Sequence, residues 1–333
     1  MIDYHPTLES VFEPWEPAMS ASPAAPGYHQ PVLLFEVLAQ LQPAPGKVIF
    51  DGTLGGGGHT EALLKAGATV IGTDQDPEAI EAATQMLGEN EGRLFIRKAN
   101  FADIDRVLAE LGIGKLDGAL LDLGVSSHQL DTPERGFSFQ RDGALDMRMS
   151  PELPFTAADL VNSATEEQLA KIFREFGEEP AGRRVAARIV RERSRVPFTH
   201  TLQLADLVAS VIPRKGRIHP ATRVFMGLRI AVNRELDTLS LALAAITAHL
   251  APGGRLAVIS FHSGEDRIVK TFMKERAVEW LDRPEWPAPR RNPDYIFRLC
   301  TSRPIVATAA ERDANPRARS AKLRVVERLS HAR

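Results

Sequence analysis

The sequence of 333 residues contains a single cysteine, Cys300, and therefore cannot form an internal disulfide. Such scarcity is typical of a reducing compartment, and we expect a cytoplasmic protein. No apolar run approaches the roughly 18 residues that suggest a membrane span, so no membrane partner is expected. The first 27 residues lack Lys and Arg, which excludes a typical secretory signal, and their Pro, Ala and Ser content predicts a disordered tail over residues 1–27.

A large net charge is also lacking, because 41 Lys and Arg against 43 Asp and Glu leave a formal charge of −2. The positive charge is nevertheless concentrated, since residues 183–233 hold eleven Lys or Arg and two acids. Within this stretch, Arg184, Arg188, Arg191 and Arg195 recur at three- or four-residue spacing and predict one basic helical face. Such a face can pair with the phosphates of a nucleic acid, although a solvated helix surface has the same pattern.

The pattern of apolar runs predicts an α/β fold with a parallel sheet. Short apolar runs alternate with helical patterns over the first part of the chain, at residues 47–50, 69–72, 93–96 and 118–121. Strands that alternate with helices form parallel sheets with right-handed crossovers. Between residues 133 and 216 helical patterns follow one another without a clear strand. The alternation then resumes with a long helix over 220–250 and strands over 255–260 and 322–328. We therefore predict a core of residues 28–132 and 217–333 with a helical insertion at 133–216.

A glycine cluster at residues 55–58 follows the first predicted strand and opens a helix, where backbone N–H groups can approach a ligand closely. Asp74 ends the next strand, about 20 residues on, where an acid can hold ribose hydroxyls. These features fit a dinucleotide almost as well as S-adenosylmethionine. Asp51 favours the latter because a carboxylate suits a sulfonium and repels a pyrophosphate, and Phe101 could lie against adenine. A ligand-free turn and a plain core role for Phe101 are the alternatives.

Seven stretches in order resemble the bacterial ribosomal RNA small subunit methyltransferase H family, of the MraW type. They are DGTLGGGGH at 51–59, LDLGVSS at 121–127, ERGFSF at 134–139, LDMR at 145–148, HPATR at 219–223, SFHS at 260–263 and NPRARS at 315–320. The resemblance runs from about Tyr28 to the C-terminus. Two residues depart from the family pattern: His128 stands where the pattern has Pro, and Gly264 stands where it has Leu. Both departures affect only the expected shape of the local loops.

The resemblance implies a Rossmann-like class I methyltransferase sheet that uses S-adenosylmethionine to methylate N4 of a cytosine in the decoding region of 16S ribosomal RNA. The partner would be small-subunit ribosomal RNA or the assembled small ribosomal subunit. The implied cofactor contacts are Gly57, Gly58, His59, Asp74, Phe101, Asp122 and Gln129. By itself, His59 would be interpreted as a helix cap or packing residue. No metal is expected.

For the chemistry, a cytosine amino nitrogen is a poor nucleophile because its lone pair is delocalised into the ring. Acceptors for its hydrogens can localise that pair, and positioning supplies most of the catalysis. The suitable place is the end of the fourth strand, where we expect Asp122, Ser126 and Ser127 to act, with Asp122 serving cofactor, base or both. His262, after the strand 255–260, is a second candidate acceptor, or a structural histidine.

Several other functions are weighed against this one. Cytosine C5 methylation needs a thiolate, and the only thiol, Cys300, lies in an apolar strand pattern, so that reaction is not expected. A non-catalytic ribosome-assembly factor with a retained cofactor fold would be expected to lose Asp74 or the glycines. A small-molecule or protein methyltransferase is disfavoured by the basic insertion, and an NAD-dependent oxidoreductase is the least favoured. The oligomeric state is left open, with a dimer as one option.

Overall fold

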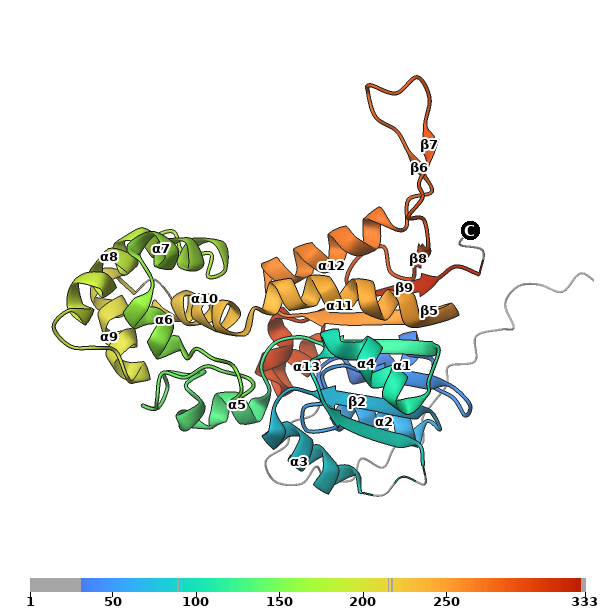
Figure 1. The fold of residues 1–333 in the computed structure, drawn as a ribbon, viewed down its shortest axis with the longest axis horizontal. Helices are drawn as coiled ribbons and strands as arrows, with labels where there is room; N and C mark the ends of the chain where they lie inside the picture. Colours follow the sequence, from blue (N-terminus) through green and yellow to red (C-terminus); the bar gives the residue numbers. More distant parts are fainter. Residues whose placement is uncertain (1–30, 89, 91, 215, 217, 331–333) are drawn as a thin grey trace, which may run out of the picture.

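The computed structural model describes residues 31–88, 90, 92–214, 216 and 218–330, so the predicted tail at 1–27 lies outside the described residues. A seven-stranded sheet forms the centre, in the order β3-β2-β1-β4-β5-β9-β8 (Figure 1). Its strands are β1 (Val48–Asp51), β2 (Thr69–Asp74), β3 (Leu94–Lys98), β4 (Leu116–Asp122), β5 (Leu250–Ser260), β8 (Phe297–Leu299) and β9 (Lys322–Arg328). Strands β1 to β5 pair in parallel, whereas β9 runs antiparallel to both β5 and β8. The carboxyl ends of five strands therefore share one edge of the sheet.

Helices account for most of the remaining described residues. They are α1 (Leu34–Leu41), α2 (Gly58–Lys65), α3 (Pro77–Leu87), α4 (Ile104–Leu111), α5 (Ser127–Asp131), α6 (Ala157–Ser163), α7 (Glu166–Glu175), α8 (Gly182–Arg193), α9 (Thr201–Val211), α10 (Ala221–Asn233), α11 (Glu235–His249), α12 (Ser263–Glu275) and α13 (Ala309–Ala314), with 3₁₀ turns η1 (Phe101–Asp103), η2 (Pro133–Arg135) and η3 (Pro316–Ser320). None of them is long and apolar enough to cross a membrane within the described part of the chain.

Both faces of the sheet are buried, which explains why its central strands are continuous apolar runs rather than alternating ones. In β1, Phe50 joins a core cluster with helices α4, α11 and α12, whereas the neighbouring Ile49 joins a second cluster with α1 and α2. The same division separates Ile71 from Val70 in β2. Successive residues of a strand point to opposite faces, so one apolar run supplies two cores.

A third hydrophobic cluster lies among the helices and contains buried residues between Phe137 and Leu228. It is built by α6, α7, α8, α9 and α10, which Figure 1 shows to one side of the sheet. We propose that this cluster is the core of the predicted helical insertion at 133–216, extended by α10 at its C-terminal end.

The long helix predicted over residues 220–250 is wrong as a single element, because the chain forms α10 and α11 with a break between them. Arg234 adopts a left-handed conformation, with φ 51°, and separates the two helices. The preceding Asn233 accepts a hydrogen bond from Met149 N and donates one to Met147 O, both at 2.8 Å. This break turns the chain from the helical cluster back to the sheet.

The strand predicted over 255–260 starts earlier, at Leu250, and its partner β4 shifts register between Leu116 and Gly118. A short ribbon of β6 (Trp280–Leu281) and β7 (Arg290–Arg291) follows α12 and projects from the body of the protein (Figure 1). Neither the ribbon nor β8 was predicted from the apolar pattern, because each has only two or three strand residues.

Candidate functional site

The carboxyl ends of the parallel strands bring several acidic side chains to one edge of the sheet. Asp51 ends β1, Asp74 ends β2 and Asp122 ends β4. In open parallel sheets ligands bind outside these strand ends, and here the strand order reverses between β1 and β4, a point typical of such sites. The predicted site residues Asp51, Asp74 and Asp122 therefore lie at the same edge of the sheet.

The glycine turn after β1 has the geometry that its sequence predicts. Gly55 and Gly57 adopt positive φ values of 51° and 86°, which favour glycine over other residues. A Cβ at Gly58 would lie 2.5 Å from Cγ of Pro31, and one at Gly52 would lie 2.8 Å from Cβ of Phe101. Close packing therefore requires glycine at the end of β1 and at the start of α2, and the first N–H groups of a helix are available to a ligand.

Asp51 is buried and accepts hydrogen bonds from Thr60 Oγ1 at 2.7 Å and from Thr53 N at 3.2 Å. Burial raises the pKa of its carboxyl to about 6, although both hydrogen bonds lower it. Asp51 thus connects the end of β1 to the first turn of α2, and its carboxyl group is buried at the sheet edge.

Asp74 holds the glycine turn against the end of β2. Its Oδ2 accepts from Gly55 N and its Oδ1 accepts from Asp76 N, both at 2.9 Å. Burial raises the pKa of Asp74 to about 6, and the charges of Asp76 and Asp51 add to this rise. Each oxygen keeps a second lone pair that a ribose hydroxyl could use.

Asp122 is the one of these acids that lacks a hydrogen-bonded oxygen. Its side chain is 23% exposed, yet Oδ1 itself is buried without a hydrogen-bond partner, and Oδ2 lies 3.7 Å from Nδ1 of His59. Burial, followed by the charges of Asp51 and Glu265, raises the pKa of Asp122 well above its usual range. An unpaired buried oxygen of this kind indicates a missing donor from a ligand.

His59 faces the same space with an acceptor atom. Its Nε2 lies 3.1 Å from the carbonyl oxygen of Val32, which can only accept, so Nε2 carries the ring hydrogen and Nδ1 is the acceptor. Burial lowers the pKa of His59 to about 4, and the ring is neutral at physiological pH. Nδ1 and Asp122 Oδ2 are then two acceptors 3.7 Å apart, an arrangement that a cationic donor would stabilise.

These residues fit S-adenosylmethionine better than a dinucleotide. Asp51, Asp74 and Asp122 bring three carboxyl groups to one edge of the sheet, with Asp122 Oδ1 unpaired, and S-adenosylmethionine brings a sulfonium and an ammonium group. An anionic pyrophosphate would be repelled by the same charges. Phe101 starts η1 after β3 and is partly buried against the sheet core, so its ring serves packing as well as any ligand contact.

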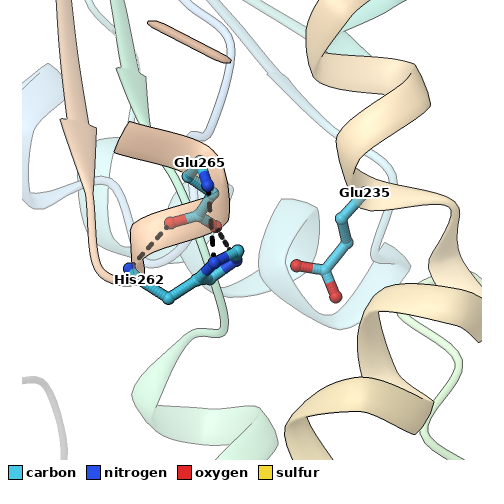
Figure 2. A group of neighbouring side chains, drawn as sticks. All are labelled: Glu235, His262 and Glu265. Atoms are coloured by element: carbon cyan, nitrogen blue, oxygen red, sulfur yellow. Dashed lines mark hydrogen bonds and ion pairs between the residues drawn. The ribbon is translucent and has the colours of Figure 1, made fainter. Parts of the chain in front are cut away.

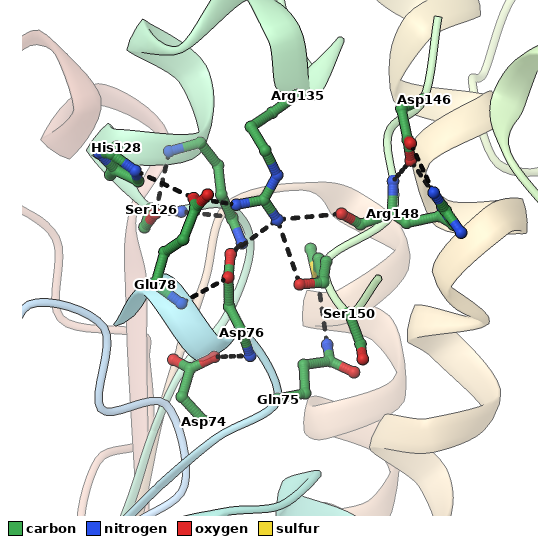
Figure 3. Close-up of polar contacts among 12 residues, drawn as sticks. Asp74, Gln75, Asp76, Glu78, Ser126, His128, Arg135, Asp146, Arg148 and Ser150 are labelled. Atoms are coloured by element: carbon green, nitrogen blue, oxygen red, sulfur yellow. Dashed lines mark hydrogen bonds and ion pairs between the residues drawn. The ribbon is translucent and has the colours of Figure 1, made fainter. Parts of the chain in front are cut away.

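The loop after β4 connects the cofactor side of the sheet to the helical cluster (Figure 3). Ser126 Oγ accepts from Gln129 N at the start of α5, while Gln129 Oε1 accepts from Ser126 N at 3.0 Å. Gln129 is buried and donates from Nε2 to Asp76 Oδ2 at 2.8 Å. The predicted catalytic Ser126 is therefore engaged as a helix cap, and the adjacent Ser127 is the first residue of α5.

Arg135, from the ERGFSF stretch, is the centre of this polar network (Figure 3). Its guanidinium donates to Asp76 at 2.8 Å and to Glu78 at 2.5 Å, and also to the carbonyl oxygens of Arg148 and Met149. Burial opposes its charge, but the two carboxylates hold the pKa of Arg135 above its usual value. The start of α3 is thereby joined to residues 135–149.

His262 caps the start of α12 and lies beside two glutamates (Figure 2). Its Nδ1 accepts from Gly264 N at 3.2 Å, and Glu265 Oε2 accepts from His262 N at 3.3 Å. Glu235, at the start of α11, makes a two-pronged ion pair with Arg229, with both N–O distances 2.9 Å. His262 and Asp122 thus lie at the ends of the neighbouring strands β5 and β4.

The predicted basic residues are placed apart from this edge. Arg184, Arg188, Arg191 and Arg195 are all exposed on or just after α8. Three of them, Arg188, Arg191 and Arg195, lie within 3.6 Å of the single acid Glu192. Figure 1 shows α8 in the part of the helical cluster remote from the sheet.

Sequence reasoning missed Arg135, Asp76, Glu235 and Glu265 as members of the site network. Arg135 lies 59 positions from Asp76, and spacing alone gives no sign of such a pair. Asp76 carried a local signal, because an Asp before Pro77 is typical of a helix N-cap. Glu265 carried a similar one, three residues after the capping His262.

Comparisons with known proteins identify the family of the chain. The MraW methylase family model matches residues 27–329. A ribosomal RNA small subunit methyltransferase H from Trichlorobacter lovleyi is 50% identical over 308 residues, 91% of this chain and 98% of the relative. One of the same name from Myxococcus xanthus is 51% identical over 304 residues, 90% of this chain and 97% of the relative.

Two solved structures are also similar. A methyltransferase from Streptococcus mutans in complex with SAH is 15% identical, with 90% of this chain and 99% of that chain covered and a TM-score of 0.42. An rRNA methylase from Streptococcus thermophilus is 12% identical, with 87% and 92% covered and a TM-score of 0.39. The predicted Rossmann-like methyltransferase sheet is confirmed by the strand order and the family match. The chain belongs to the MraW methylase family.

Proposed function

We propose that the protein transfers the methyl group of S-adenosylmethionine to the N4 amino group of a cytosine in the decoding region of 16S ribosomal RNA. The observation that carries the proposal is the unpaired Asp122 Oδ1 at the end of β4, at the same sheet edge as Asp51, Asp74 and the glycine turn. Relatives that match nearly their whole length, and that are named ribosomal RNA small subunit methyltransferase H, support the same activity.

S-adenosylmethionine supplies an electrophilic methyl group when it is bound. Gly57, Gly58 and His59 would hold its amino acid end, and Asp74 its ribose, as the charges and free lone pairs of the site allow. Asp122 would accept a hydrogen from the cytosine amino group, which localises the nitrogen lone pair and orients it. The raised pKa of Asp122 makes it able to take up a proton after transfer.

The target base must leave its stack to reach this edge of the sheet, at a cost of a few kcal/mol that is least in single-stranded RNA. We propose that the helical cluster around residues 137–228 grips the RNA around that base, with the exposed arginines of α8 contacting phosphates. The assembled small subunit and free 16S RNA are alternative forms of the substrate.

A direct test is the transfer of labelled methyl from S-adenosylmethionine to purified small subunits that lack the modification, with free 16S RNA in parallel. Nucleoside analysis should show N4-methylcytidine as the product. A product methylated at cytosine C5, or no transfer to either substrate, would contradict the proposal.

The C5 alternative is disfavoured by the position of the only thiol. Cys300 follows β8 and donates its backbone N–H to Val325 O at 3.0 Å, so it lies by β9, beyond β5 from the site. Burial raises the pKa of the Cys300 thiol, which opposes the thiolate that C5 chemistry needs.

We further propose that the protein acts in the cytoplasm, where its ribosomal substrate is found.

The non-catalytic assembly factor remains a second candidate only if the cofactor fails to bind. Calorimetry with S-adenosylmethionine distinguishes them, since the buried acids around the glycine turn predict measurable affinity. Whether the protein is a dimer can be measured by light scattering.

A further inference from the structure

Two polar atoms at neighbouring strand ends are buried without a hydrogen-bond partner. They are Asp122 Oδ1 after β4 and His262 Nε2 after β5, and in the described part of the chain only Thr301 Oγ1 and Arg317 Nη1 share this state. Asp122 pairs in register with Ile259, three residues before His262, so both atoms belong to one edge. Unpaired buried groups are costly, and a sheet edge that keeps two of them at the ends of neighbouring strands is suited to a ligand.

The hydrogen-bond partners of His262 determine which of its ring atoms is a donor. Nδ1 accepts from Gly264 N at 3.2 Å and from Glu265 N at 3.4 Å, as the cap of α12. A nitrogen that accepts N–H bonds cannot carry a hydrogen, so the ring hydrogen is on Nε2. His262 therefore presents a donor to the site, whereas the sequence suggested an acceptor.

The neighbouring glutamates suggest a metal site at first, since Glu235, His262 and Glu265 have ligand atoms within 4.8 Å of one another. Their bonds oppose this. Nε2 carries a hydrogen, both oxygens of Glu235 are bound by Arg229, and Glu265 Oε2 accepts from two backbone N–H groups. Glu265 Oε1 lies at an ion-pair distance of 3.1 Å from Nε2 (Figure 2), but Nε2 forms no hydrogen bond to it. The acids hold the imidazole in place instead.

We propose that His262 Nε2 donates a hydrogen bond to ring N3 of the target cytosine and thereby makes the site specific for that base. This inference rests on the proposed function. Cytosine carries its N4 amino donor next to the N3 acceptor, and the pair Asp122 Oδ1 and His262 Nε2 offers an acceptor next to a donor. Uracil has an acceptor at O4 and a donor at N3, so both contacts would be reversed. A site with buried polar groups strongly rejects a ligand that leaves them unpaired.

Two substitutions separate the capping role of His262 from its donor role. In His262→Asn the side-chain oxygen can take the place of Nδ1, because Asn is a good N-cap, but nothing replaces Nε2. In His262→Gln the longer side-chain amide can place an N–H where Nε2 lies in the wild-type protein, but the capping hydrogen bonds to the start of α12 are lost. We expect the Asn variant to keep its melting temperature and its affinity for S-adenosylmethionine, and the Gln variant to melt earlier.

The decisive measurement combines these variants with a changed base. Small subunits are reconstituted with 16S RNA that carries either cytidine or 3-deazacytidine, which lacks the N3 acceptor, at the methylated position. With cytidine, His262→Asn should lower kcat/KM about 5- to 50-fold, the loss of one buried hydrogen bond. With wild-type protein, 3-deazacytidine should cost a similar factor, whereas the Asn variant should not distinguish the two bases. The Gln variant should retain part of the discrimination.

The outcomes are distinguishable. If wild-type protein methylates both bases equally well, His262 does not contact N3 and the inference fails, while the proposed function stands. An equal penalty for 3-deazacytidine in wild type and the Asn variant leads to the same conclusion. If wild-type protein transfers no methyl group to cytidine in these subunits, the proposed function itself fails and the inference with it.

Discussion

The carboxylates of Asp51 and Asp74 show how burial tunes single residues of the site. In both, burial raises the pKa from 3.8 to about 6, and hydrogen bonds from Thr60, Thr53, Gly55 and Asp76 only partly offset it. The protein thus keeps two acids ionised at pH 7 that are close to taking up protons. Charges held at this cost are typical of a functional site, where a ligand cation can stabilise them.

A pH dependence of cofactor binding follows. A bound cation favours the ionised carboxylates, so S-adenosylmethionine affinity should be constant above pH 7 and fall as the pH drops through about 6. At pH 5 the dissociation constant should rise about tenfold for each carboxyl that must lose its proton. His59, with its pKa lowered to about 4, stays neutral in this range. Calorimetry from pH 5 to 8 measures the profile.

The matched control for this profile is Asp74→Asn, which keeps one acceptor oxygen for the two backbone N–H groups of Gly55 and Asp76 but cannot titrate. It should bind more weakly at pH 8 and show a flatter decline toward pH 5. A wild-type affinity that does not change between pH 8 and 5 would contradict the role assigned to the two acids.

A second residue-scale prediction concerns Asp122, whose Oδ1 is buried without a partner. Asp122→Ala should lower the rate of methyl transfer by about two orders of magnitude or more, as for the loss of other groups placed to stabilise a transition state. Cofactor binding should survive in part, because Asp74 and the glycine turn remain. Single-turnover methylation and calorimetry on the same variant test both points. Near-normal methylation would show that Asp122 is neither the amino acceptor nor an essential cofactor ligand.

At the scale of elements, the network of Arg135 joins α3 to the loop over residues 135–149. Arg135 is 15% exposed and Asp76 only 2%, so removal of the guanidinium leaves a buried carboxylate with fewer partners. Arg135→Ala should lower the free energy of unfolding by about 2–3 kcal/mol, as for lost hydrogen bonds to charged groups. Arg106→Ala, which breaks the exposed pair with Glu110, should cost less than about 0.5 kcal/mol. Urea unfolding of both variants compares them, and equal stabilities would refute the role of Arg135.

The elements also show how far sequence reasoning extends. Strands β1 and β2 were predicted nearly as they occur, because a strand buried on both faces is a compact apolar run between turn signals, and β9 was predicted from its partly alternating, half-buried pattern. The single helix over 220–250 was wrong because the left-handed turn at Arg234 is set by tertiary contacts of Asn233 with Met147 and Met149, some 85 positions away. No local pattern records such contacts.

The site residues also divide into those that a local sequence pattern predicts and those that depend on tertiary contacts. The glycine turn, Asp74 and Asp122 could be found from the sequence because each directly follows a strand, and strand ends meet at one edge. His59 and Gln129 came from the family resemblance alone. The donor role of His262 could not be predicted, because it depends on which backbone N–H groups reach Nδ1. Hydrogen-bond direction is a property of the folded chain.

At the scale of the whole molecule, the site lies where the sheet meets the helical cluster. Arg229 of α10 and Glu235 of α11 form an ion pair across the break between the two helices, with side chains 16% and 11% exposed. Arg135 joins the same two parts of the protein at another point, through Asp76. In the proposed function, the strand ends would supply the acids for the cofactor, and the adjoining helices would supply the surface that holds a large RNA.

The last prediction concerns that surface. Arg184, Arg188 and Arg191 are exposed on α8, in a chain whose net charge is only −2. If they contact phosphates, RNA affinity should fall with salt at a slope of about −0.7 per contact on single strands. Their joint replacement by Ala should flatten that slope by up to about 2 units. Cofactor affinity should be unchanged, because α8 lies away from the strand ends (Figure 1).

The control for this triple variant removes the same charge elsewhere, by replacing Lys65, Arg106 and Lys115, which are exposed around the sheet, with Ala. If position matters, only the α8 variant should flatten the slope; if net charge alone matters, both should. Glu192 partly neutralises Arg188 and Arg191, so the change in salt slope can be smaller than about 2 units. A small change still counts as an RNA contact if the melting temperature of the variant is unchanged. Subunit binding measured at several salt concentrations decides between them. An unchanged slope in a stable α8 variant would remove these arginines from the RNA site and leave the substrate surface to residues nearer the strand ends.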